Sequence, residues 1–147
     1  MKFGEDIVRD RLREAVRPFL EPGEQVVAVD LWRTPRRTRK ALDAARDVRL
    51  PPNMYAFLTS RRLLIYEQSG HGDAPLGELA DQIPIGDVEA ITERRGLVAS
   101  IAWRMTLRVR GRDYVLIPLD EPWLHYMIEG LEKVRSGAPL GSQARGP

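Results

Sequence analysis

The stretch from Asn53 to Glu67 constrains the fold of this chain more than any other. It holds two apolar runs rich in aromatic and large aliphatic residues, 54–58 and 63–66, on either side of a polar break at Thr59–Arg62. Short bounded runs of this composition are typical of β-strands joined in a hairpin. Because side chains alternate across a strand, the first run places apolar groups on both faces. We therefore expect a β-hairpin whose strands both face a core.

Further strands of an antiparallel sheet are predicted on both sides of this hairpin. The segment 25–32 is apolar, and 83–91 contains a proline that confines it to a sheet edge or a bulge. The segment 101–109 alternates with a period of two, and a glycine-containing reversal then leads to a partner strand at 113–117. Because 101–109 is long and free of proline, we expect it to be an open edge of the sheet.

Three segments lack the pattern of a strand or of a long helix. The segment 68–82 has no periodicity and contains several glycines and prolines, so an exposed loop is expected, with His71 as a solvated residue in it. The segment 33–50 is predicted to be a basic insertion carrying a short, weakly apolar helix. The tail 136–147, rich in glycine and proline, is expected to be disordered.

Two amphipathic helices are predicted, one near each end. The first should end or kink near Val16 or Arg17, because Pro18 removes a backbone donor. It packs on its own domain, on a partner protein or on a membrane surface. Its apolar stripe is the candidate interaction surface: Phe3, Ile7, Val8, Leu12 and Val16. The second helix, capped by Asp120, runs over about 122–134 and covers the sheet with one face.

Charge is unevenly distributed along the chain, although the net charge is only +2. Residues 33–49 hold seven basic and two acidic residues, and residues 94–112 hold six arginines and no acid. A concentrated basic segment attracts anions that the net charge would not. Both segments are therefore candidate binding surfaces.

The order of elements and three short motifs resemble the pleckstrin-homology-like superfold, in particular bacterial PH-like and GRAM-type domains. The motifs are Leu20–Val26, Ala56–Tyr66 and Ile83–Val88 with a later Ile91. The resemblance implies an α+β fold: a strongly bent antiparallel sheet or partly open barrel of about seven strands with a C-terminal capping helix. We expect a PH-like domain at 20–135, preceded by an extra N-terminal helix at 1–19.

This resemblance implies binding, since members of the superfold bind phosphoinositides, peptides or copies of themselves. Phosphoinositide binders carry basic residues on the first two strands and the loop between them; here the second strand, 53–59, has none. The candidate residues for an anionic lipid are Arg33, Arg36, Arg37, Arg39 and Lys40. Protein–protein interaction or self-association is the first prediction, and the peripheral association with an anionic membrane lipid is its alternative.

A nucleic-acid surface is a further alternative. Arg104, Arg108 and Arg110 project from one face of a predicted strand at a spacing comparable to that of phosphates. Single-strand binders interleave exposed aromatic side chains with such cations, whereas Trp103 alternates to the opposite face. The solvated outer face of a sheet gives the same pattern.

No catalytic residue, cofactor or metal is expected. The sequence contains no phosphate loop, zinc-protease motif or nucleophile elbow, and no cysteine. It has two histidines, and His125 is predicted to be a hydrogen-bonded or half-buried residue of the C-terminal helix. No run is as apolar as a membrane span requires, so we expect a cytoplasmic protein that associates, if at all, with the inner face of the membrane.

Overall fold

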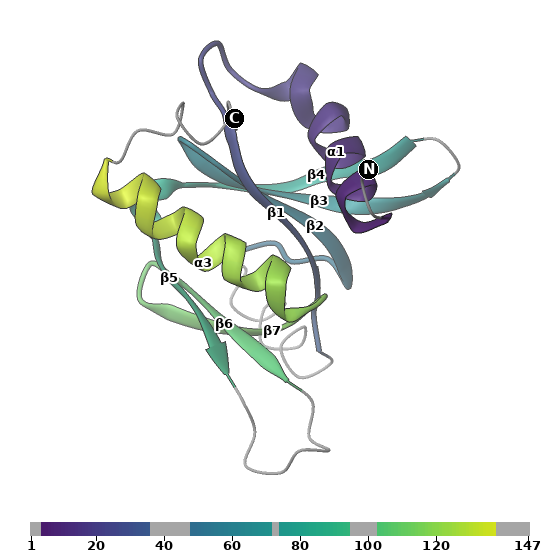
Figure 1. Ribbon diagram of the computed structural model, residues 1–147. Helices are drawn as coiled ribbons and strands as arrows, with labels where there is room; N and C mark the ends of the chain where they lie inside the picture. Colours follow the sequence, from purple (N-terminus) through teal and green to yellow (C-terminus); the bar gives the residue numbers. More distant parts are fainter. Residues whose placement is uncertain (1–3, 36–47, 72–73, 95–102, 138–147) are drawn as a thin grey trace.

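The chain forms one seven-stranded antiparallel sheet with two helices packed against it (Figure 1). The computed structural model describes residues 4–35, 48–71, 74–94 and 103–137. The helices are α1 (Gly4–Val16) and α3 (Glu121–Ser136). Two short 3-10 turns lie at Arg17–Phe19, directly after α1, and at Ile85–Asp87, between β4 and β5. The strands are β1 (Val26–Arg33), β2 (Asn53–Thr59), β3 (Arg62–His71), β4 (Ala74–Pro84), β5 (Val88–Arg94), β6 (Arg104–Val109) and β7 (Arg112–Pro118).

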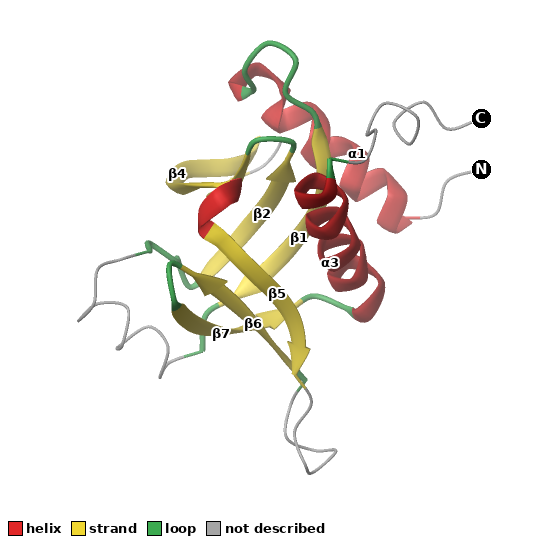
Figure 2. Cartoon of the chain, turned by 90° about the vertical axis from the view of Figure 1, so that its left-hand side faces the viewer, coloured by secondary structure: helices red, strands yellow, loops and turns green. Residues whose placement is uncertain are grey.

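The sheet bends at β1, which belongs to both of its halves. β1 pairs along its length with β2, but it pairs with β7 only at Trp32 and Arg33. The strand order is therefore β4-β3-β2-β1-β7-β6-β5, with an opening beside the first part of β1. α3 lies across this opening and contacts both β1 and β5 (Figure 2). The predicted α+β architecture, including the capping helix, is confirmed.

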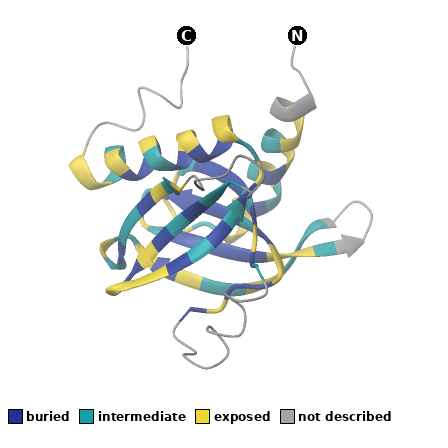
Figure 3. Cartoon of the chain, turned by 90° about the horizontal axis from the view of Figure 1, so that it is seen from below, coloured by how far each residue is buried: buried dark blue, intermediate teal, exposed yellow. Residues whose placement is uncertain are grey.

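The main core fills the space between the two halves of the sheet and α3 (Figure 3). Alternate side chains of β2 and β6 point into it, and α3 adds an apolar stripe. These residues are Met54, Ala56, Leu58, Met105, Leu107, Val109, Leu124, Met127 and Leu131. Gly130 allows α3 to approach β1 closely, because a Cβ at this position would lie 2.8 Å from Val27 Cγ1. The helix is capped as predicted, since the Asp120 side chain accepts a hydrogen bond from Trp123 N at 3.0 Å.

A second core lies on the other face of the sheet, under α1. Leu12 and Val16 are buried there with Phe57 from β2 and Tyr66 from β3, and Trp123 of α3 closes one side. The helix ends at Val16, and Pro18 sits in the following 3-10 turn, as predicted. α1 thus packs in cis on its own domain through the inner part of its apolar stripe.

Two of the expected motifs meet at the turn of the β2–β3 hairpin. Arg62 donates to both carboxylate oxygens of Glu24, each at 2.9 Å, and Thr59 Oγ1 donates to the same carboxylate at 2.6 Å. Gln25 N donates to Ser60 Oγ at 3.1 Å. The segment before β1 and the hairpin turn therefore contact one another, and these bonds hold the start of β1 to the sheet.

Three strand predictions are wrong. The segment 68–82 is largely β-strand, because β3 extends to His71 and β4 pairs with it. Its register shifts three times between Ile65 and His71, and such bulges remove the regular alternation that identifies a strand in a sequence. The second error concerns 101–109: β6 pairs with β5 on one side and β7 on the other, so it is an interior strand. The third concerns 83–91, which is not one strand but the end of β4, a 3-10 turn at Ile85–Asp87 and the start of β5.

The edges among the described strands are β4 and β5. β4 carries Pro75 and Pro84, which agrees with the expected edge position of the latter. Along β5, the Arg135 side chain from α3 donates to the Glu89 carbonyl. The prolines of β4 therefore disfavour further strand pairing at that edge, and α3 covers part of the edge at β5.

Candidate binding surfaces

The predicted lipid-binding loop is described only at its ends. Arg33, the last residue of β1, is exposed and lies opposite Asn53 and Ile117. Arg49, on the far side of the loop, is also exposed, and its backbone N–H donates to Asp81 at 3.0 Å. The other candidates, Arg36, Arg37, Arg39 and Lys40, lie outside the described residues.

The predicted nucleic-acid surface is interspersed with acidic groups. Arg108 pairs with Glu89 at 3.0 Å and with Asp113 at 3.1 Å, because β5 and β7 flank β6. Arg110 has left the strand for the hairpin turn, with a φ of 49°, and it pairs with Asp87 at 3.0 Å. Arg104 donates to the Trp103 carbonyl at 3.2 Å. Acids of β5, of β7 and of the 3-10 turn before β5 thus offset part of the charge that the segment 94–112 shows on its own.

The apolar stripe of the predicted interaction helix is partly buried in the core and partly exposed to solvent. Leu12 and Val16 are buried, whereas Ile7 and Val8 are 47% and 44% exposed. Phe3 lies outside the described residues. Only the outer part of the stripe is therefore available to a partner.

Exposed apolar side chains come from α1, from the 3-10 turn that follows it and from β4, and two of them lie near Tyr66. Leu79 of β4 is paired with Tyr66 of β3, and the ring centroids of Tyr66 and Phe19 are 6.0 Å apart. Cross-strand partners share one face of a sheet, so Leu79 lies on the face that α1 covers. Phe19 is 57% and Leu79 41% exposed. We call Val8, Phe19 and Leu79 the apolar flank.

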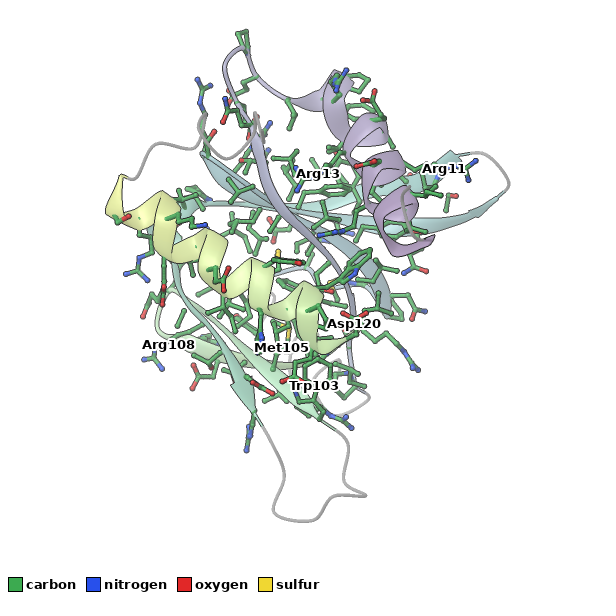
Figure 4. The ribbon with its side chains drawn as sticks, viewed as in Figure 1. Arg11, Arg13, Trp103, Met105, Arg108 and Asp120 are labelled. Atoms are coloured by element: carbon green, nitrogen blue, oxygen red, sulfur yellow. The ribbon has the colours of Figure 1, made fainter. Side chains whose placement is uncertain are left out.

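On its opposite side, α1 is separated from α3 by a concave space of about 350 Å³. We call it the inter-helix groove. Arg9 and Arg13 line it from α1, Tyr126, Glu129 and Lys133 line it from α3, and residues 27–29 of β1 form its floor. Arg13 points from α1 toward β1, whereas Arg11 points away, toward the β3–β4 hairpin (Figure 4). The groove exists because β1 is not paired with β7 along this part.

Sequence reasoning missed this groove. The spacing of Arg9 and Arg13, four residues apart on a predicted helix, places them on neighbouring positions of one face. No local pattern connects them with Lys133, which is 120 residues away in the chain. Only the packing of α3 beside α1 brings the three cations together.

One side-chain group at the start of α3 has the donor types of a cation site. Glu93, Glu121 and His125 place ligand atoms within 4.8 Å of one another, and His125 Nε2 lies 3.4 Å from Glu93 Oε2. Trp103 Nε1 donates to the other oxygen of Glu93 at 3.0 Å. His125 and Glu121 are exposed, as is common for surface ion pairs. His71, the other histidine, is the last residue of β3.

Comparison with solved structures shows the fold. A DUF1696 family protein with a pleckstrin-homology domain from Shewanella loihica PV-4 has a TM-score of 0.51 and 11% identity, covering 85% of this chain and 91% of the other. The hSac2 domain of the human phosphoinositide phosphatase Sac2 has a TM-score of 0.51 and 14% identity, covering 93% and 85%. The Vps36 N-terminal PH domain has a TM-score of 0.47 and 14% identity, covering 80% and 86%. No protein-family model and no curated protein matches the sequence.

The chain has the fold of a pleckstrin-homology-like domain, with an additional N-terminal helix. No helix among the described residues is long and apolar enough to cross a membrane.

Proposed function

We propose that this chain is a non-catalytic interaction module of the cytoplasm that associates with other proteins, in the first place with a second copy of itself. The observation that carries the proposal is the apolar flank. Val8, Phe19 and Leu79 remain exposed beside a second core that α1 otherwise covers. Apolar side chains gathered on one surface favour association.

A second copy fits this surface for a reason of charge. A two-fold dimer brings the same patch of each subunit into contact, so the patch must complement itself. α1 carries charges of both signs: Glu5, Asp6, Asp10 and Glu14 are acidic, and Arg9, Arg11 and Arg13 are basic. Two copies of α1 running antiparallel can therefore place opposite charges together around the apolar contact.

Light scattering on the full-length chain at tens of micromolar tests this proposal. We expect a dimer, and we expect Val8→Glu combined with Leu79→Glu to give a monomer, because each places a charge in the contact. Leu119→Glu is the matched control, since Leu119 is 50% exposed in the β7–α3 connection. A wild-type chain that is monomeric at this concentration would overturn self-association.

A second candidate, weak attraction to an anionic membrane surface, is supported by the basic insertion. Both of its described ends, Arg33 and Arg49, are exposed. Co-sedimentation with phosphatidylglycerol vesicles should then fall with salt and with alanine at 36, 37, 39 and 40. Equal sedimentation with neutral vesicles would exclude an electrostatic role. Fluorescence anisotropy with single-stranded oligonucleotides separates the nucleic-acid alternative at Arg104, Arg108 and Arg110.

A further inference from the structure

Three metal-binding side chains meet where the start of α3 lies beside the end of β5. His125 Nε2 is 3.4 Å from Glu93 Oε2 and 3.9 Å from Glu121 Oε1, and the three ligand atoms all lie within 4.8 Å of one another. Two ligand atoms of a tetrahedral ion with bonds of about 2.1 Å are about 3.4 Å apart. These side chains, which we call the three-donor cluster, are therefore already close to the spacing of a zinc site.

The pairing of the sheet directs Glu93 toward α3. Glu93 is paired with Met105 of β6, which is buried in the main core. Cross-strand partners share one face of a sheet, so Glu93 lies on the face that α3 covers. Trp103 Nε1 donates to Glu93 Oε1 at 3.0 Å, and Trp103 itself packs against the main core. This bond holds the Glu93 carboxylate with its other oxygen toward His125.

α3 supplies the other two donors from one side of its first turns. Glu121 and His125 are four residues apart, and such positions are neighbours on a helix surface. Asp120 caps the helix directly before them, so the turn that carries Glu121 is fixed. The side chains of Glu121 and His125 remain 53% and 46% exposed. Both can therefore turn toward an ion that enters from solvent without disturbing the core.

The existing interactions of the two carboxylates are compatible with coordination. Glu93 and Glu121 each take part in further interactions within the chain, so an ion would share them with other groups. A carboxylate offers about four lone-pair sites on its two oxygens, and a metal bond needs only one of them. Carboxylates that bind metals are commonly hydrogen-bonded as well, as Glu93 is by Trp103.

The imidazole determines which cation the three-donor cluster suits. Carboxylates on their own suit Mg²⁺ and Ca²⁺, whereas an imidazole suits Zn²⁺ and related transition metals. We propose that Glu93, Glu121 and His125 bind Zn²⁺, with water completing the tetrahedron, and that the ion ties the first turn of α3 to β5. At the other end of α3, the Arg135 side chain donates to the Glu89 carbonyl, so the ion gives the helix a second anchor on the same strand.

Calorimetric titration of the untagged full-length chain with Zn²⁺ tests this inference. We expect saturable binding of one ion per chain and no comparable binding of Mg²⁺. The midpoint of thermal unfolding should rise with zinc, because an ion bound only by the folded state stabilises that state. His125→Gln should weaken binding by about tenfold or more, since losing even a group that supports a ligand costs about 10–100-fold, and it should abolish the thermal shift. The three-donor cluster contains no residue of the apolar flank, so the result does not depend on self-association.

Three further variants separate a built site from general attraction of a cation. Trp103→Phe keeps an aromatic ring but removes the donor to Glu93, and it should weaken binding by about tenfold. His71→Gln removes the other histidine, and Glu132→Gln removes a carboxylate about 10 Å further along α3; both should leave the affinity within about twofold. No saturable binding at millimolar zinc, unchanged binding in His125→Gln, or an equal loss in either control would overturn the inference.

Discussion

Glu24, just before β1, and Asp30, within β1, are two buried carboxylates whose environments shift their pKa values in opposite directions. Burial on its own raises the pKa of Glu24, but hydrogen bonds from Arg62 and Thr59 and the charge of Arg62 lower it to about 2. Burial likewise raises the pKa of Asp30, and hydrogen bonds from Trp32 and Leu31 only partly oppose it, so the pKa reaches about 7. Asp120 adds to the increase.

This difference shows what decides whether a buried carboxylate stabilises a fold. Glu24 has a cation in a bidentate contact, and ionised it holds the start of β1 to the hairpin. Asp30 is fully buried and accepts from Trp32 Nε1 and Leu31 N, both at 2.8 Å, which are neutral donors. Burial disfavours the ionised form of both carboxylates. The presence of a cationic hydrogen-bond partner lowers the pKa of Glu24, and the lack of one at Asp30 leaves its pKa raised.

The largest expected effect is that of Glu24→Gln. This change leaves Arg62 without its counter-ion in a largely buried position, and breaking a buried pair in this way costs about 3–5 kcal/mol. Chemical denaturation at neutral pH measures the loss. Glu21→Gln is the matched control, because Glu21 meets Arg61 at 3.4 Å on the exposed surface, where a pair contributes about 0–1 kcal/mol. Equal effects of the two changes would show that burial of the pair is irrelevant.

The same variant has a signature at acid pH. The folded-state pKa of Glu24 lies below its ordinary value of 4.5, so its contribution is present above that value and is lost as the pH falls toward about 2. The stability of Glu24→Gln should therefore fall less steeply over this window than that of the wild type. An unchanged slope would contradict the role assigned to Arg62.

Asp30 should produce the opposite trend. Its folded-state pKa lies above the ordinary value of 3.8, so the folded chain holds a proton that the unfolded chain has lost, and stability decreases as the pH rises from about 4 to about 7. One such group gives a slope of at most about 1.4 kcal/mol per pH unit. Asp30→Asn should remove that slope, as denaturation at a series of pH values would show. If the variant keeps the wild-type dependence of stability on pH, a group other than Asp30 is responsible for it.

The smallest expected effect separates charge from geometry at Arg62. Arg62→Lys keeps the positive charge but cannot donate to both oxygens of Glu24 and also to Gln82, which Arg62 reaches at 2.6 Å. We expect a loss of about 1–3 kcal/mol, the contribution of a charge-assisted hydrogen bond. Thermal unfolding of this variant beside Arg61→Lys provides the measurement. A loss as large as that of Glu24→Gln would mean that geometry outweighs charge.

The sequence determined most of the sheet. The hairpin at 53–67, the alternation in β6, the cap at Asp120 and the end of α1 before Pro18 were all predictable, because each depends on residues that are close together in the chain. β4 was missed because its identification depends on residues far apart in the chain. Bulges in its pairing with β3 remove the alternation of apolar and polar residues that identifies a strand, and the pairing itself involves two separate segments.

The binding surfaces, in contrast, are determined by the tertiary structure. The arginines of the segment 94–112 form a basic run in the sequence, yet Glu89 and Asp113 pair with Arg108, and Asp87 pairs with Arg110. Conversely, Arg9 and Arg13 look like an ordinary solvated helix face until α3 packs beside them and adds Lys133. The sequence specifies which segments are apolar and which residues terminate them. Which charges are neutralised and which line a groove together depends on contacts between residues far apart in the chain, because electrostatic interactions follow distance in space.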